Sequence, residues 1–320
     1  MSGFPRPKIV VSKCLGFAAC RYDGKMLQAT IVDHLKSFVD FIDVCPESEI
    51  GLGIPRDPVI IVLNDRKRLL QPSNGLDFTD RMEGFSKSYL EELDDFDGFI
   101  LKSKSPSCGV GTTKVFHDAG SKEFLHGHEN GFFADAVLRD YPDLPLIDEQ
   151  QLNDPVLREH FLTGVFALAS FRQCSLSGKV LTLEPLIGYH ARNKLLFMAL
   201  DKQIMTAMGN IVANRDGLLI EVIYEKYLSY LLKILAKRAE PRSTVNAMMH
   251  AFGYFSRNLS AGEKFEFMRK LQECREDLSV IFELRQWFIS CAQEFNVYYL
   301  LDQTLFNPYP PELSDGFRVV

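Results

Sequence analysis

The sequence has few of the features that mark membrane or secreted proteins. Its 320 residues include one tryptophan and seven cysteines, and no apolar stretch reaches the roughly 20 residues that a membrane helix requires. Residues 1–8 have no apolar core of the kind found in a secretory signal peptide. We therefore expect a cytoplasmic protein without membrane segments. Its cysteines should be reduced, with some acting as ligands rather than forming a disulfide framework.

The sequence also lacks internal repeats and low-complexity tracts. Hydrophobic residues make up 46% and charged residues 24%, which is typical of a globular protein long enough for two domains. The net charge of −6 is unevenly distributed, because residues 1–150 carry −7 and residues 151–320 carry +1. Residues 172–242 include eleven basic and six acidic residues. This charge favours the second half for contact with a polyanion, but it is equally typical of solvated helices.

Residues 1 to about 150 alternate short apolar runs with helix-like segments. The predicted strands are 9–11, 41–44, 58–63, 99–101 and 145–148. The predicted helices are 28–38, 78–93, 131–138 and 154–171. This alternation is typical of βαβ units, so we predict an α/β domain with a Rossmann-like parallel sheet over residues 1–172.

From residue 180 the pattern becomes helical throughout. Apolar residues recur at helical spacing within 204–212, 219–234 and 245–252. Ser260 and Glu263 form a capping box that begins a fourth helix, and 278–303 predicts a fifth. We therefore expect an all-α domain over residues 180–320.

Three cysteines each follow one of the predicted strands. Cys14 and Cys45 come directly after apolar runs, and Cys108 follows another run by a short Ser/Lys/Pro loop. If the strands are parallel, the three thiolates meet at the carboxyl edge of the sheet, where open α/β sheets place their ligands. Three soft ligands at one point indicate an iron–sulfur cluster, or zinc, with one coordination position open for chemistry.

Polar residues accompany each cysteine. Glu47 stands two residues after Cys45, where it would act as an acid or base beside the metal, although taken alone such a residue is more often a solvent-facing glutamate in a turn. Ser105, Ser107 and Gly109 surround Cys108 in a segment suited to holding a small group, or in a plain Ser-Pro turn.

The segment around the first cysteine supplies further candidates. Ser12 precedes Cys14, and Arg21 and Tyr22 would orient a planar or anionic substrate. Cys20 is an alternative fourth ligand, which would close the site and indicate electron transfer or a structural role.

Other suggestive residues receive structural interpretations. Cys174, Cys274 and Cys291 lie in helical stretches typical of buried cysteines. His126 and His128 form a pair typical of a metal site, but we predict a glycine-rich loop there. The segment 109–114 lacks the spacing of a P-loop.

Taken together, the three cysteine motifs resemble the thiouracil desulfidase family of iron–sulfur enzymes. The matching motifs are Ser12–Leu15, Arg21–Gly24, Cys45–Glu47 and Ser105–Gly109, in the order typical of that family. The resemblance covers roughly the first 150 residues. The all-α remainder is similar to a helical domain of unknown function that is often fused to the desulfidase domain, as in bacterial enzymes that remove sulfur from 4-thiouridine in tRNA.

The resemblance implies a 4Fe–4S cluster held by Cys14, Cys45 and Cys108. Glu47 would be the general acid or base for attack of water on the thiocarbonyl carbon, and Ser105 would assist proton transfer. Ser12, Arg21, Tyr22, Ser107 and Gly109 would contact the substrate. Sulfide would leave without net redox change. Because the sequence after Cys14 departs from the simpler members, specificity for the free base does not follow.

A tRNA substrate would require a surface that contacts phosphates. We predict such a basic face in the helical domain, with two tyrosines between the cations: Lys226, Tyr227, Tyr230, Lys233, Lys237, Arg238 and Arg242. Two alternatives remain open at this point. One is a free thiopyrimidine or its nucleotide as substrate, and the other is a non-catalytic RNA-binding protein stabilised by its metal.

Overall fold

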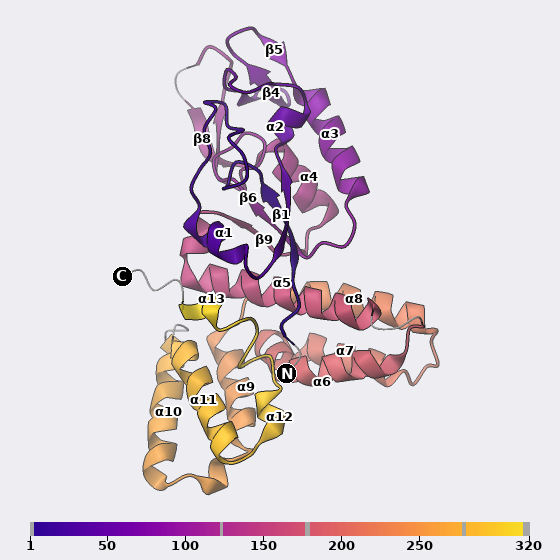
Figure 1. Cartoon of the computed structure of the whole chain (residues 1–320), viewed down its shortest axis with the longest axis vertical. Helices are drawn as coiled ribbons and strands as arrows, with labels where there is room; N and C mark the ends of the chain where they lie inside the picture. The colour runs from indigo at the N-terminus through magenta and orange to yellow at the C-terminus, as the bar shows by residue number, and fades with distance from the viewer. Residues whose placement is uncertain (1–2, 122–123, 177–179, 277–279, 316–320) are drawn as a thin grey trace. The chain divides into compact units, whose positions relative to one another are not determined.

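The computed structural model describes residues 3–121, 124–176, 180–276 and 280–315 (Figure 1). Contacts divide the chain into two compact units. One is Arg6–Phe161, and the other contains Leu162–Val320 together with Met1–Pro5. The first unit is an α/β domain and the second consists of helices, as the sequence predicts.

A parallel sheet forms the centre of the α/β unit. In the described part of the chain it has four strands in the order β2 (Asp40–Val44), β1 (Lys8–Ser12), β6 (Gly98–Leu101) and β9 (Leu146–Asp148). All neighbouring pairs are parallel, with Val10 opposite both Ile42 and Phe99. The four strands coincide with predicted runs. The central strands β1 and β6 are buried and leave an unbroken hydrophobic signal, whereas the edge strand β2 carries Asp40 and Asp43.

Helices α3 (Thr79–Glu92) and α4 (Phe132–Asp140) pack against each other in the same unit. Their aromatic side chains meet, since the ring of Phe133 lies 5.8 Å from that of Tyr89 and 6.4 Å from that of Phe85. Phe133 and Leu90 share a buried cluster with Val10 of the sheet. Two shorter helices, α1 (Thr30–Leu35) and α2 (Pro46–Glu49), precede them. Helices α1, α3 and α4 overlap predicted helices. Helix α2 was not predicted and is only one turn long.

A second sheet differs from the prediction of a single parallel sheet. The described residues give it the order β5 (Leu76–Asp77), β4 (Lys67–Gln71), β3 (Ile60–Leu63), β7 (Thr113–Phe116) and β8 (Phe124–Glu129). The predicted strand 58–63 therefore belongs here, paired with β4 and β7. His126 and His128 lie on β8 rather than in a loop, because His126 pairs with Val115 across the sheet. The strands that the sequence did not predict, such as β4, β7 and β8, are short and contain charged or polar residues, so they show little alternation.

The 3₁₀ helix η1 (Gln151–Asn153) and helix α5 (Pro155–Leu176) lead into the helical unit. Its helices are α6 (Leu183–Leu200), α7 (Lys202–Ala213), α8 (Ile220–Leu235), α9 (Pro241–Phe252), the 3₁₀ helix η2 (Ser256–Asn258), α10 (Ala261–Glu276), α11 (Ile281–Glu294), α12 (Tyr298–Leu301) and α13 (Glu312–Asp315). Among the described helices, none is long and apolar enough to cross a membrane.

Two local predictions in this unit have different outcomes. The capping box is confirmed, because the Ser260 N–H and hydroxyl both donate to Glu263 and the Glu263 N–H donates back to Ser260 Oγ. The predicted helix 278–303 is instead α11 and α12, since Asn296 adopts a left-handed backbone conformation with φ 55°. The start of that prediction falls on residues outside the described ranges.

Candidate active site

The three predicted ligand cysteines lie at the carboxyl edge of the parallel sheet. Cys14 stands two residues after β1, Cys45 directly after β2, and Cys108 in the loop that follows β6. Because β2, β1 and β6 are adjacent parallel strands, their carboxyl ends meet at one edge. All three cysteines line a single cavity of about 440 Å³. Cys45 and Cys108 are buried, and Cys14 is partly exposed.

Most of the other predicted residues line the same cavity. Its lining includes Ser12, Arg21, Tyr22, Glu47 and Ser105. Ser107 and Gly109 are not in the lining but belong to the same loop as Ser105. Ser107 is fully buried and reaches the cavity through a hydrogen bond to Glu47.

The loop that carries Ser105 and Cys108 is fixed by the start of α4. The N–H groups of Phe133 and Ala134 donate to the Ser107 carbonyl at 2.9 and 3.1 Å, and the N–H of Phe132 donates to Pro106. Free N–H groups at a helix start need such acceptors. Gly131 permits this approach, because a Cβ there would lie 2.3 Å from the Ser107 carbonyl oxygen.

The Glu47 carboxylate is held on both oxygens. Arg56 donates to Oε2 from Nε at 3.0 Å and from Nη2 at 2.7 Å. The hydroxyls of Ser105 and Ser107 donate to Oε1 at 3.3 and 3.1 Å. The Glu47 and Arg56 side chains are only 13% and 4% exposed. Such a set of donors fixes the carboxylate in one orientation beside the cysteines.

Ser105 connects this carboxylate to the cysteine loop. Its hydroxyl oxygen accepts the N–H groups of Ser107 at 3.2 Å and of Cys108 at 3.1 Å, while its proton is donated to Glu47. The hydroxyl is therefore held in place by two backbone N–H groups and by the Glu47 carboxylate.

Arg56 is a site residue that the sequence reasoning missed. Besides binding Glu47, its Nη1 donates to the carbonyl oxygens of Cys20 and Gly53, both at 2.9 Å. It follows Glu47 by nine residues, between Pro55 and Pro58. The planar guanidinium group of arginine is suited to binding a buried carboxylate from two nitrogens. An arginine between two prolines after the Cys-Pro-Glu motif was the only local signal.

Cys20 lines the same cavity, and its thiol is hydrogen-bonded to those of Cys14 and Cys45. The Cys14 contact raises the pKa of Cys20 to about 11. The contact with Cys20, together with burial, raises the pKa of Cys45. Burial raises the pKa of Cys108 to about 12. Thiols bind a metal as thiolates, so metal binding at these cysteines must release protons.

The cysteines fit an iron–sulfur cluster in donor type. Across the described residues, no group of three or more His, Cys, Asp or Glu side chains is placed to hold a metal ion. Cys14, Cys45 and Cys108 come from three separate segments and line one cavity, and thiolates are the ligands that iron–sulfur clusters take.

Cations at the rim of the cavity are mostly engaged by carboxylates. Lys102 Nζ lies 2.6 Å from Glu149 Oε1, and Ser103 donates its N–H and its hydroxyl to the same carboxylate. The Lys102 N–H donates to Ser12 Oγ at 2.9 Å, which ties β1 to the start of the cysteine loop. Tyr22 at the rim is 45% exposed.

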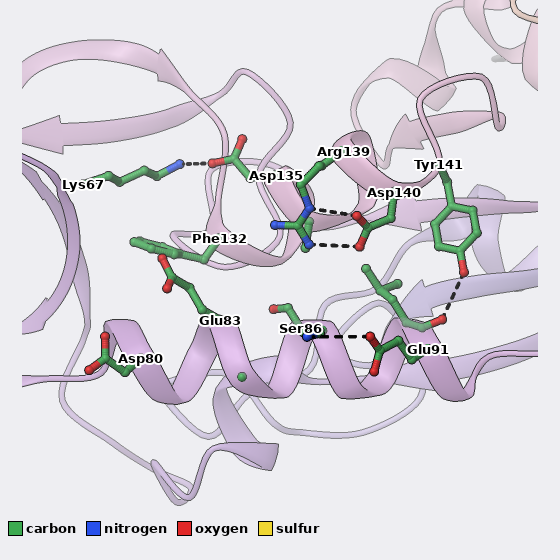
Figure 2. A pocket seen from close by; sticks show the side chains of 14 residues that line it. Lys67, Asp80, Glu83, Ser86, Glu91, Phe132, Asp135, Arg139, Asp140 and Tyr141 are labelled. Atoms are coloured by element: carbon green, nitrogen blue, oxygen red, sulfur yellow. Dashed lines mark hydrogen bonds and ion pairs between the residues drawn. The ribbon is translucent and has the colours of Figure 1, made fainter.

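A larger cavity lies between α3 and α4, with a volume of about 1040 Å³ (Figure 2). Its cations face carboxylates, with Lys67 2.5 Å from Asp135 and Arg139 2.8 Å from Asp140. Tyr141 donates to the Leu90 carbonyl across it (Figure 2). The lining contains none of the predicted site residues.

The predicted basic face in the helical unit needs one correction. Lys226, Lys233 and Lys237 are exposed at α8 or just after it, and Lys233 Nζ lies 5.5 Å from the Tyr230 ring centre. Tyr227, in contrast, is fully buried and stacks on Phe171. It follows Lys226 directly, so the helical turn carries its side chain into the core.

Comparisons with known proteins agree with both units. Residues 9–149 match the family model described as 2-thiouracil desulfurase, and residues 194–310 match a model of a protein of unknown function (DUF1722). The chain is 33% identical over 156 residues to the uncharacterized protein YbbK of Bacillus subtilis (strain 168), covering 46% of this chain and 98% of YbbK. It is 30% identical over 104 residues to the uncharacterized protein YbgA of Escherichia coli (strain K12), covering 32% of this chain and 60% of YbgA. A solved structure, the [4Fe-4S]-dependent thiouracil desulfidase TudS, matches with a TM-score of 0.37 at 27% identity, over 46% of this chain and 93% of TudS.

Proposed function

The chain belongs to the 2-thiouracil desulfurase family, with a DUF1722 domain after the desulfurase domain, and from this we propose that it is a 4Fe–4S desulfidase. Its substrate would be a base of the 4-thiouracil type carried in tRNA. The reaction replaces the thione sulfur with oxygen from water and releases sulfide, without net redox change.

The observation that carries this proposal is the cavity that brings three cysteines together with one fixed carboxylate. Cys14, Cys45 and Cys108 would hold the cluster, and Glu47 lines the same space. When bound, a cluster with three cysteine ligands supplies an iron with an open position, a Lewis acid for the thione sulfur. The remaining chemistry belongs to the side chains of the chain itself.

Glu47 is the group that handles protons in this proposal. A carboxylate beside the substrate carbon accepts a proton from the attacking water and later returns one to the leaving sulfur. The Ser105 hydroxyl donates to Glu47 Oε1 and so supplies a further group for proton transfer beside the carboxylate. Arg56 occupies Oε2, which leaves Oε1 as the oxygen shared with the serines.

The tRNA substrate is supported by the charge of the helical unit. Lys226 and Lys233 are exposed along α8, with Lys233 beside the ring of Tyr230, and Lys237 after the helix is exposed and paired with Asp201 at 2.9 Å. Phosphate contacts of this kind give affinity without sequence readout, and they weaken as salt rises. A base within folded RNA must also be exposed or flipped out before it enters a cavity of about 440 Å³.

The test compares two substrates with anaerobically reconstituted, full-length protein. One reaction contains tRNA with 4-thiouridine and the other contains free 4-thiouracil. Loss of thione absorbance and release of sulfide are followed in both. The proposal expects turnover of the tRNA, with a rate at limiting substrate that falls steeply between low and physiological salt.

The other outcomes identify the alternatives. Turnover of the free base alone would keep the chemistry and exclude the tRNA substrate. No turnover of either substrate by cluster-loaded protein that still binds tRNA would favour a non-catalytic RNA-binding protein.

A further inference from the structure

The proposed reaction has no role for Cys20, although its thiol lies among the proposed cluster ligands. Cys20 follows Cys14 by six residues and is only 2% exposed. Its side chain is hydrogen-bonded to those of Cys14 and Cys45. Cys45 Sγ also donates to the Cys20 carbonyl at 3.8 Å. One non-ligand thiol thus touches two of the three proposed ligand thiols.

The segment between Cys14 and Cys20 is held in a compact turn. The N–H groups of Phe17 and Ala18 donate to the Lys13 carbonyl at 3.2 and 3.0 Å, and the Cys20 N–H donates to Ala18 at 2.9 Å. Arg56 holds the far end through the Cys20 carbonyl. The backbone between the two cysteines is therefore held in place, and both side chains line the same cavity.

The two thiols differ in access from solvent. Cys14 is partly exposed, whereas Cys20 is buried behind it. An oxidant entering the cavity therefore reaches the Cys14 sulfur more readily than the Cys20 sulfur, which is in contact with it. Redox-responsive sites have this arrangement, in which an accessible thiol reacts first and an adjacent thiol resolves the product.

We propose that Cys20 is a resolving cysteine, which forms a disulfide with Cys14 when the protein lacks its cluster and meets a low-molecular-weight disulfide. The Cys14 thiolate attacks the small disulfide, forms a mixed disulfide and releases one small thiol. The Cys20 thiolate then attacks Cys14 Sγ and releases the second small thiol. The two cysteines lose two electrons and two protons, and the small disulfide is reduced to two thiols.

While this disulfide exists, Cys14 is not available as a cluster ligand, and reduction makes it available again. A disulfide is restored by thiols, whereas oxidation of a lone cysteine to sulfinic or sulfonic acid is in general not reversed. Reloading with iron and sulfide would then require prior reduction. That consequence rests on the proposed function, whereas the disulfide itself does not.

The sequence makes this bond directly measurable. Trypsin cleaves after Lys13 and after Arg21, so Cys14 and Cys20 are released in the single peptide 14–21. Full-length, cluster-free, reduced protein is exposed to glutathione disulfide, free thiols are alkylated, and the digest is analysed by mass spectrometry. We expect peptide 14–21 to lose two hydrogens and to escape alkylation at both cysteines.

Two variants separate a resolving role from general reactivity. In Cys20→Ala the reaction should stop at the mixed disulfide, so that peptide 14–21 carries glutathione on Cys14. Cys174→Ala, a matched change at a cysteine outside the cavity lining, should give the same internal disulfide as the natural sequence.

Three results would overturn the proposal. They are a Cys14–Cys45 bridge in the natural sequence, a Cys20–Cys45 bridge in place of the internal one, and alkylation of both cysteines in peptide 14–21 after oxidation. No substrate enters this experiment. Failure of the desulfidase proposal would therefore leave the disulfide intact, and failure of the disulfide would leave the desulfidase proposal standing.

Discussion

Two cavities of the α/β unit have opposite character. The cavity between α3 and α4 measures about 1040 Å³, more than twice the 440 Å³ of the cysteine cavity. In the larger one, cations pair with well-exposed carboxylates: Lys67 with Asp135, whose side chain is 43% exposed, and Arg139 with Asp140, whose side chain is 36% exposed. In the smaller one, side chains from several distant segments converge on Glu47 and the thiols.

The difference teaches that convergence, and not volume, marks the site. Arg139 and Asp140 are adjacent in sequence and would meet on almost any helix surface, so their pairing carries little information. Glu47 and Ser105 are separated by 58 residues, and Arg56 and Cys20 by 36. Only the fold joins such groups, and burying the charged pair of Glu47 and Arg56 costs free energy of desolvation.

The strongest test of this contrast removes a proposed cluster ligand. Cys108→Ser replaces a soft thiolate at the cavity by a hard hydroxyl, which is a poor ligand for iron–sulfur clusters. We expect cluster affinity to fall at least about 100-fold, since changes to groups outside the ligand set already cost 10–100-fold. Iron and sulfide content and visible absorbance after anaerobic reconstitution measure this. Cys291→Ser, a buried cysteine outside the cavity, should retain the cluster.

The next test compares one glutamate from each cavity. Glu47→Gln keeps the shape of the side chain but removes the carboxylate that takes up protons. We expect kcat to fall by about 10²–10⁴-fold with the cluster retained. Glu83→Gln, the same change in the α3–α4 cavity, should leave kcat within about twofold because surface changes are usually near neutral. Equal losses in both variants would remove the functional distinction between the cavities.

A smaller loss is expected from the residue that orients Glu47. Arg56→Lys keeps the charge but loses the planar fork that binds Oε2 from two nitrogens. We expect kcat to fall by about 10–100-fold with KM nearly unchanged, because misplacing a reacting group has effects of this size. Steady-state kinetics on loaded protein give the split. A raised KM at constant kcat would assign Arg56 to substrate binding instead.

The smallest effect concerns stability at the rim of the cysteine cavity. Burial favours a raised pKa for Glu149, but Lys102 and Ser103 lower it below its usual range. The ionised form therefore stabilises the fold above the usual glutamate pKa of about 4.3, and this contribution is lost as pH falls through the lower folded value.

Glu149→Gln should remove this pH dependence. We expect a loss of about 1–3 kcal/mol in the free energy of unfolding at pH 7, the range for hydrogen bonds to a charged group. Against the natural sequence, the difference should shrink as pH falls below about 4. Urea titrations at several pH values measure it. A difference that stays constant down to low pH would show that packing, and not the charge, accounts for the loss.

Much of the fold could be predicted because its signals are local. The central strands β1 and β6 of the parallel sheet contain continuous apolar runs, and the capping box of Ser260 and Glu263 is complete within four residues. The second sheet escaped prediction because strands such as β4 contain Lys67 and Arg68 and alternate weakly. The split between α11 and α12 depends on one backbone conformation at Asn296, which carries no strong sequence signal.

The sequence by itself determined which chemical groups this protein has available and in what order. Three cysteines after apolar runs, a glutamate after Cys45 and serines before Cys108 are all present in the chain as read. Only the tertiary structure decided that Arg56 fixes Glu47 and that Cys20 touches Cys14 and Cys45. The reason is physical. Periodicity and motif spacing report each residue's own segment, whereas a site assembled from separate loops exists only after the parallel strands have brought their carboxyl ends together.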